Sequence, residues 1–283
     1  MIRPIIAVAA LLLLQACSAI KLGYQQLPTL SYWWLDSAVS FNSEQSVRAK
    51  EALAQLHQWH RSEELGPYAD FLQTQAQRSQ HTAEATQVCS AFSEAQTRLD
   101  RLMREAVRQA APVAMLLGPR QLSHMARQWE KSNEEWEKEW LQGDATARLE
   151  RRKDRTLSRY SDFYGELSHE QTELIKTQLT QSPWNAEWGR RDRQRRQQDL
   201  LSALQRIQQY GLTQAQAQAE LWGVWERWLK PPDPSDASLM QTMTQRACNN
   251  LTQLHNTASP EQRLRATRRL RAYERDLRDL ILP

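Results

Sequence analysis

The scarcity of glycine is the feature that most restricts the fold of this chain. Only 8 of its 283 residues are glycine, fewer than its 11 tryptophans. Tight turns and phosphate-binding loops depend on glycine, because glycine adopts positive φ angles without steric cost. The chain is rich instead in good helix formers, with 30 arginines against 7 lysines and 32 glutamines. This composition disfavours a β-sandwich, a barrel or a glycine-lined nucleotide site, and it favours helices.

Apolar residues recur at the spacing of an α-helix along most of the chain. In the segment 119–141, one such stripe consists of Leu122, Met125, Trp129, Trp136 and Trp140. The alternation of polar and apolar residues that is typical of strands does not occur. The sequence therefore predicts an all-α fold of about ten helices in one irregular bundle-like domain.

Two prolines are expected to interrupt long helices. The first long helix is expected to end near Glu64, because Gly66 and Pro67 follow. A helix over 82–109 is expected to end before Pro112, which then starts a separate short apolar piece.

Capping patterns mark the starts of two later helices. Ser168 is followed three residues later by Gln171, and Ser259 by Gln262. In a capping box the serine accepts a hydrogen bond from the third amide, and the glutamine reaches back to the cap amide. Near the N-terminus, the aromatic cluster 30–36 predicts a short helix that docks this end of the chain.

The first residues are typical of an export signal. Arg3 gives a positive start, and the uncharged run 5–14 is too short to span a bilayer. The sequence Leu14-Gln15-Ala16-Cys17 resembles a bacterial lipobox, in which the cysteine thiol is lipidated after export. The alternative is an ordinary secretory signal with a cysteine there by chance.

This resemblance implies three segments and a location. We expect a signal peptide over 1–16, a lipidated tether over 17–26 and an all-helical periplasmic domain over 27–283. Several acyl chains anchor a protein stably where one does not. Ser18, rather than an aspartate, follows the cysteine, which implies sorting to the outer membrane, facing the periplasm.

Two cysteines remain in the mature chain, Cys89 and Cys248. An even number of cysteines in an oxidising compartment predicts a disulfide. The alternative is a pair of buried free thiols.

The most concentrated group of polar side chains with chemical potential is His57, His60 and Glu64, which fall on one side of a helix. Imidazole and carboxylate groups suit zinc, so the cluster indicates a partial metal site. The alternative is a buried histidine with a structural role. Motifs of nucleophilic, zinc-protease, phosphate-loop and dinucleotide chemistry are absent from the sequence. We therefore expect no catalytic residue, metal or cofactor.

Two further groups are candidates for a binding surface. A net charge of +4 is too small to make nucleic acid an expected partner. A local run of cations instead suggests anionic lipid headgroups or an acidic partner, unless it is a solvated face with acidic neighbours. The tryptophans suggest a ligand groove, unless they pack in the core. The residues concerned are Arg190, Arg191, Arg193, Arg195, Arg196, Trp222, Trp225 and Trp228.

Several short motifs carry a resemblance to a known family. They are Leu22-Gly23-Tyr24, the cluster Tyr32-Trp33-Trp34-Leu35-Asp36, Trp59-His60-Arg61, Glu64-Leu65 and Tyr68. Together with the lipobox, they resemble a proteobacterial helical lipoprotein family that is known only as a domain of unknown function. The resemblance implies an exported, lipid-anchored helical protein and supplies no catalytic residues.

A weaker resemblance concerns the helix caps. Leu212-Thr213-Gln214-Ala215-Gln216 is similar to the Leu-Thr-x-x-Gln repeat of periplasmic chaperones of the Spy and CpxP type. Any helical protein also needs such caps.

The sequence as a whole predicts a non-enzymatic protein, anchored by lipid, that binds a protein partner or an envelope component as a chaperone or scaffold would. The alternative is a metal-dependent or acid–base hydrolase whose site includes His57, His60 and Glu64.

Overall fold

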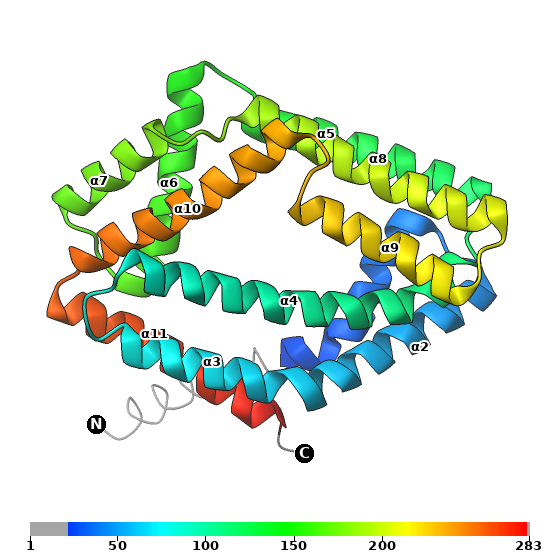
Figure 1. Ribbon diagram of the computed structural model, residues 1–283, viewed down its shortest axis with the longest axis horizontal. Coiled ribbons are helices and arrows are strands. Elements are labelled where there is room, and N and C mark those ends of the chain that lie inside the picture. Colours follow the sequence, from blue (N-terminus) through cyan, green and yellow to red (C-terminus); the bar gives the residue numbers. More distant parts are fainter. Residues whose placement is uncertain (1–21, 282–283) are drawn as a thin grey trace, which may run out of the picture.

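The computed structural model describes residues 22–281, and in this range the chain folds into α-helices without strands (Figure 1). The N-terminal helix covers 22–39. The α-helices that follow are α2 (Ser43–Trp59), α3 (Leu65–Arg78), α4 (Ala85–Ala114), α5 (Pro119–Trp140), α6 (Ala145–Tyr164), α7 (His169–Thr180), α8 (Ala186–Tyr210), α9 (Gln214–Leu229), α10 (Pro234–Asn256) and α11 (Pro260–Ile281). The predicted all-α fold is confirmed.

The N-terminal helix is longer than predicted. It already includes residues 22–26, which were expected to belong to a tether, and it continues to residue 39. Tyr32 docks it by donating a hydrogen bond to Ser46 on α2 at 2.9 Å. Trp33 and Trp34 of the aromatic cluster take no part in this docking, since they are 63% and 70% exposed.

Neither expected proline break occurs. Between α2 and α3 the backbone widens into a π-helix, η1 (His60–Glu64), and the chain stays helical past Pro67. A π-turn just before a proline lets a helix pass a residue that has no N–H to donate. Pro112 lies inside α4 on its exposed side, where water can reach the carbonyl that loses its donor.

The predicted capping boxes are confirmed, and their glutamines do more than cap. Gln171 and Gln262 each accept from the backbone N–H of their own cap serine, at 3.0 Å in both cases. Their side-chain amides also donate to each other, at 2.8 and 2.9 Å. The N-termini of α7 and α11 are thereby tied together.

The same arrangement joins α2 to α5. Gln45 caps α2 and Gln121 caps α5, and their side-chain amides donate to each other. Gln45 is only 3% exposed and also donates to the carbonyl of Leu116. A buried side-chain amide lowers stability unless its oxygen and nitrogen are hydrogen-bonded. Both atoms of the Gln45 amide have hydrogen-bond partners.

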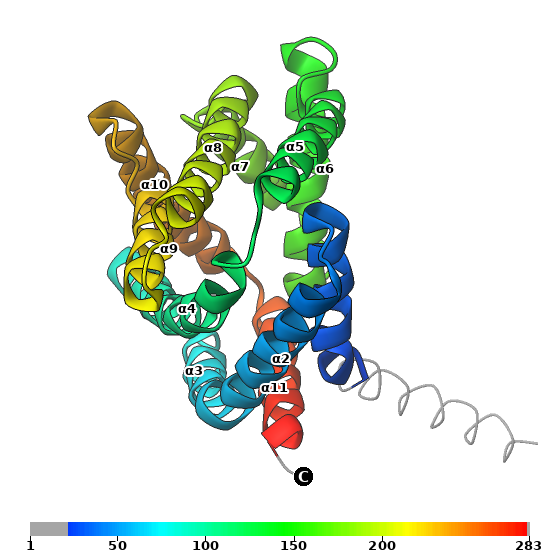
Figure 2. The same ribbon diagram turned by 90° about the vertical axis from the view of Figure 1, so that its right-hand side faces the viewer.

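The helices form a circuit of pairwise contacts. α4 packs against α9 and α10, and α9 packs against α8. Trp188 near the start of α8 donates from Nε1 to Asp236 of α10 at 2.7 Å, which closes the circuit. α3 packs along α11. In both views α4 lies between this pair and the pair of α5 and α8 (Figures 1 and 2).

The hydrophobic core is divided between two clusters. The larger joins α4, α5, α8 and α9 through residues that include Val107, Leu122, Leu204, Ile207 and Leu221. The smaller joins α6, α7, α10 and α11 through Tyr164, Ile175, Leu254, Ala258 and Ala266. Within the described range, no helix is both long and apolar enough to cross a lipid bilayer.

The predicted disulfide is confirmed. Cys89 on α4 bonds to Cys248 on α10, with the two Cα atoms 5.2 Å apart and a separation of 159 positions in the sequence. α4 belongs to the larger core cluster and α10 to the smaller one. The bond therefore links the two clusters covalently.

We expect that replacing both cysteines by serine lowers the melting temperature. For a 159-residue loop the chain-entropy estimate is about 5 kcal/mol of unfolding free energy, and strain or residual structure reduces it. Mass analysis of the exported wild-type protein without reductant should show the linked peptides. Two thiols that alkylate freely in that material would contradict the bond.

Candidate functional site

The predicted cluster of His57, His60 and Glu64 is a structural junction. His60 Nδ1 lies 2.9 Å from the Tyr24 hydroxyl, and His57 Nε2 lies 3.0 Å from the Tyr24 backbone carbonyl. Glu64 is fully buried, and its Oε1 lies 2.9 Å from Nε of Arg101 on α4. No group of three or more metal-binding side chains occurs within residues 22–281.

The electrostatics of this junction also indicate packing. Burial lowers the pKa of His60, and the neighbouring His57 lowers it further. Burial raises the pKa of Tyr24 to about 12. A neutral imidazole and a neutral phenol near pH 7 therefore join the N-terminal helix to η1. Arg61 extends the junction to α11 by donating from Nε to the Leu280 carbonyl at 2.7 Å.

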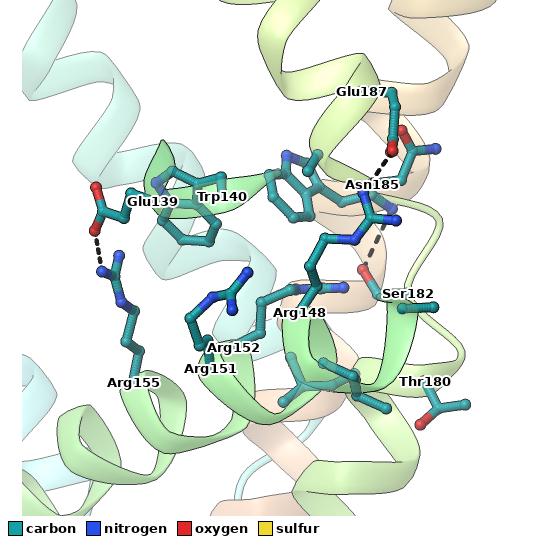
Figure 3. A pocket seen from close by; sticks show the side chains of 15 residues that line it. Glu139, Trp140, Arg148, Arg151, Arg152, Arg155, Thr180, Ser182, Asn185 and Glu187 are labelled. Carbon is teal, nitrogen blue, oxygen red and sulfur yellow. Dashed lines mark hydrogen bonds and ion pairs between the residues drawn. The ribbon is translucent and has the colours of Figure 1, made fainter. Parts of the chain in front are cut away.

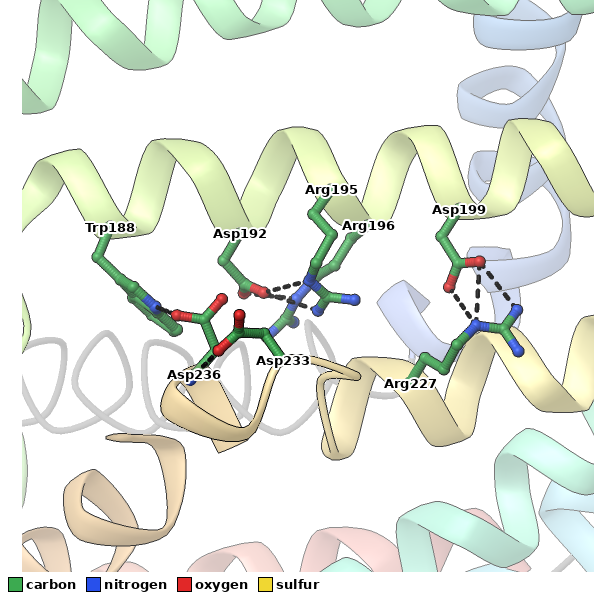
Figure 4. A network of polar contacts seen from close by, with 8 residues as sticks. All are labelled: Trp188, Asp192, Arg195, Arg196, Asp199, Arg227, Asp233 and Asp236. Atoms are coloured by element: carbon green, nitrogen blue, oxygen red, sulfur yellow. Dashed lines mark hydrogen bonds and ion pairs between the residues drawn. The ribbon is translucent and has the colours of Figure 1, made fainter. Parts of the chain in front are cut away.

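Most arginines of the predicted basic surface on α8 form contacts with other residues of the chain. Asp192 on α8 is 6% exposed, and both Arg195 and Arg196 lie 2.7 Å from its carboxylate (Figure 4). Arg193 donates to Asn133 and Ser132 of α5, and Arg190 faces Glu137 of α5 at 3.8 Å. Among the five arginines, Arg191 alone is exposed and without a side-chain partner in the described part of the chain.

The three tryptophans of α9 join helices rather than line a groove. Trp225 is buried and donates from Nε1 to Asp100 of α4 at 2.9 Å. Arg104 of α4 lies 4.1 Å from the ring centre of Trp222. Arg196 of α8 lies 5.6 Å from the ring centre of Trp228. Trp225 is therefore part of the core, Trp222 packs against the larger core cluster, and Trp228 is half-buried between α8 and α9.

A pocket that the sequence analysis missed lies where the end of α5 meets α6 and the start of α8. Its volume is about 330 Å³. Figure 3 shows the side chains that line it. Four arginines of α6 point into it: Arg148, Arg151, Arg152 and Arg155. Their spacing of three, four and seven residues places them on one face of the helix. Trp140 and Trp184 line the same space and stack edge to face at 5.6 Å. We call it the arginine–tryptophan pocket.

Three of the four arginines are held by neighbours. Arg148 pairs with Glu187 of α8 at 2.7 Å, and Arg155 pairs with Glu139 of α5. Arg151 donates to the backbone carbonyl of Gln142. These contacts fix the walls of the pocket and neutralise its two carboxylates.

Arg152 is the exception. Its guanidinium lies 4.7 Å from the ring centre of Trp184, and no carboxylate pairs with it within residues 22–281. Burial lowers the pKa of this arginine, although the group stays charged near pH 7. The pocket holds four arginines against two carboxylates, so its charge is positive, and Arg152 is the arginine in it that has neither a carboxylate nor a carbonyl partner among the described residues.

This arrangement suits the binding of an anion. A guanidinium matches the geometry of carboxylate or phosphate oxygens with two parallel donors, and the flat tryptophans supply contact area. The lining has no nucleophile with an adjacent base, because both of its carboxylates are in ion pairs. The pocket therefore presents groups that suit the binding of an anion.

Comparisons with known proteins give a family and no activity. The model of a family of unknown function (DUF6279) matches residues 37–227. All residues that line the arginine–tryptophan pocket lie inside this range. No curated protein and no solved structure matches the chain.

We expect stability to fall below about pH 6.5, the ordinary histidine pKa, because burial lowers the pKa of both His60 and His255 in the folded state. The unfolded chain then takes up protons first, so acid favours unfolding until the folded imidazoles protonate. His60→Gln should remove part of this loss, since glutamine can accept from Tyr24 but does not titrate.

The measurement is the free energy of unfolding in denaturant between about pH 8 and pH 5. His169→Gln is the matched control, because His169 is exposed at the start of α7. An unchanged pH profile in His60→Gln would contradict the structural role of this histidine.

Proposed function

Because the chain belongs to the DUF6279 family of unknown function, we propose its function from its own structure. We propose a non-enzymatic, lipid-anchored envelope protein that binds a phosphate-bearing envelope component in the arginine–tryptophan pocket. The observation that carries the proposal is Arg152, a partly buried cation stacked on Trp184 without a carboxylate partner. A phosphate group would supply the negative charge that Arg152 lacks, and it would accept hydrogen bonds from two parallel N–H groups of the guanidinium.

Binding is a better proposal than hydrolysis. The hydrolase alternative depends on His57, His60 and Glu64, and each of these side chains already has an internal partner. The chaperone resemblance depends on caps such as Thr213–Gln216, which here close a helix N-terminus on itself. The arginine–tryptophan pocket remains as the place where a ligand adds a missing contact.

The lipid anchor is part of the proposal. The lipobox and Cys17 lie outside the described residues, so lipidation and location at the outer membrane, facing the periplasm, remain predictions. Two observations support them. The disulfide suits an oxidising compartment. Trp33 and Trp34 are exposed on the helix that follows Cys17, and tryptophan is favoured at membrane–water interfaces.

The pocket is tested by binding to phosphatidylglycerol vesicles, with phosphatidylcholine vesicles and soluble glycerol phosphate as separate arms. We expect Arg152→Gln to weaken binding to the first by about tenfold, since a hydrogen-bonded charge contributes about 1.5 kcal/mol or more. Binding to glycerol phosphate would identify the phosphate itself as the ligand, free of a membrane surface.

Arg191→Gln is the control, because Arg191 is the exposed and unpaired member of the basic run on α8. Its binding should equal that of the wild type. If Arg191→Gln weakens binding and Arg152→Gln does not, the surface run and not the pocket contacts the ligand.

The anchor is tested separately by Cys17→Ser. We expect the variant to be released from membranes by mild washing, because the exposed tryptophans alone provide little buried apolar area. Fractionation of cells and intact mass of the wild-type protein measure this. A variant that still sediments with the outer membrane, or a wild type without added lipid mass, would refute lipid anchoring.

A further inference from the structure

A second cavity lies where α3, α4, α6, α10 and α11 meet, and it measures about 500 Å³. Its walls are mainly apolar and include Phe71, Val88, Phe92, Phe163, Leu251 and Leu270. Small-molecule sites are typically cavities of roughly 300–1,000 Å³ with apolar walls and a small number of polar groups. The cavity has this size and character.

Its charged groups have one sign. Arg78 and Arg159 line the cavity together with no acidic residue. Both arginines are exposed, and neither forms an ion pair with any residue of the described chain. Cations beside an apolar cavity complement an amphiphile with an anionic head.

A buried donor in the wall also lacks a partner. The side-chain nitrogen of Gln75 is inaccessible and makes no hydrogen bond within residues 22–281. Buried polar groups rarely lack a partner in a folded protein. Because this nitrogen is closed to water in the structure, a ligand oxygen would reach it only after the Gln75 side chain turned toward the cavity.

The one histidine of the lining is fully engaged. His255 Nε2 donates to the carbonyl of His81 at 2.8 Å, and its Nδ1 accepts from the Tyr164 hydroxyl at 2.9 Å. Burial lowers the pKa of His255 and raises the pKa of Tyr164 to about 12. Both groups are neutral near pH 7, so this wall is polar without adding charge.

The disulfide holds two walls of the cavity together. Cys89 is adjacent to Val88 on α4, and Cys248 is three residues from Leu251 on α10. The bond fixes the separation of these helices, which keeps the cavity shape defined.

We propose that this cavity binds a free fatty acid, with its acyl chain among the apolar walls and its carboxylate facing Arg78 and Arg159. A carboxylate matches both the sign of these cations and the geometry of a guanidinium. A single acyl chain matches the size of a mainly apolar cavity whose lining belongs to five helices. The inference does not depend on the arginine–tryptophan pocket, because no residue lines both.

The test uses the full chain with Cys17→Ser, so that no covalent lipid competes, and titrates it calorimetrically with saturated fatty acids from octanoate to stearate. Each added methylene should tighten binding by up to about fourfold until the chain fills the cavity. Ala91→Trp fills the cavity from α4 and should abolish binding. Ala110→Trp is its control, on an exposed position of the same helix.

The carboxylate is tested by the double variant Arg78→Gln with Arg159→Gln. Palmitate should bind to this variant about tenfold more weakly than to the Cys17→Ser chain. Hexadecanol, which has no carboxylate, should bind equally to both. Arg120→Gln with Arg127→Gln, two exposed arginines of α5, is the matched control. Circular dichroism and melting temperature verify that each variant is folded.

Three results would overturn the proposal. One is the absence of saturable binding for every fatty acid tested. Another is palmitate binding that Ala91→Trp leaves intact in a folded protein. The third is binding in the Cys17→Ser chain but none in the lipidated wild type, which would assign the cavity to the protein's own acyl groups.

Discussion

The paired capping glutamines are the interaction on which the arrangement of helices most depends. Gln45 with Gln121, and Gln171 with Gln262, each close a helix N-terminus and also hydrogen-bond across to the other. A glutamine that left its cap would break both its own helix start and the junction between two helices. With the apolar core divided into two clusters, these paired amides, of which Gln45 and Gln171 are buried, act with the disulfide to define how the helices pack.

Arginine is the chief cation of this chain, and many of its arginines form contacts with other side chains within the fold. Asp192 holds two of them and Asp199 holds Arg227, so α8 is tied to its surroundings by ion pairs (Figure 4). A high content of arginine is therefore no measure of a binding surface. Arg152, Arg78 and Arg159 differ from these arginines, because each lines a pocket and has neither a carboxylate nor a carbonyl partner in the described part of the chain.

The sequence predicts the helices, their caps and the disulfide because these depend on local pattern or on a single choice of partner. It fails at Pro67 and Pro112, where a π-turn and an exposed helix face let the backbone pass a proline. The arginine–tryptophan pocket was missed for another reason. On α6 alone the four arginines have the pattern of a solvated face, and they line a pocket only because Trp184 and Glu187 lie opposite them. That approach depends on tertiary packing, which no local pattern contains.

The arginine–tryptophan pocket and the apolar cavity are both lined by α6, so they could form one site or two. Arg148 to Arg155 on the first half of α6 line the arginine–tryptophan pocket, and Arg159 to Tyr164 on the second half line the apolar cavity. The remaining walls differ, with α5, α7 and α8 contributing to the first and α3, α4, α10 and α11 to the second. One is polar and arginine-rich, and the other is apolar with its cations exposed. A ligand that fits one chemistry would leave the other unsatisfied, so we treat them as separate sites on a shared helix.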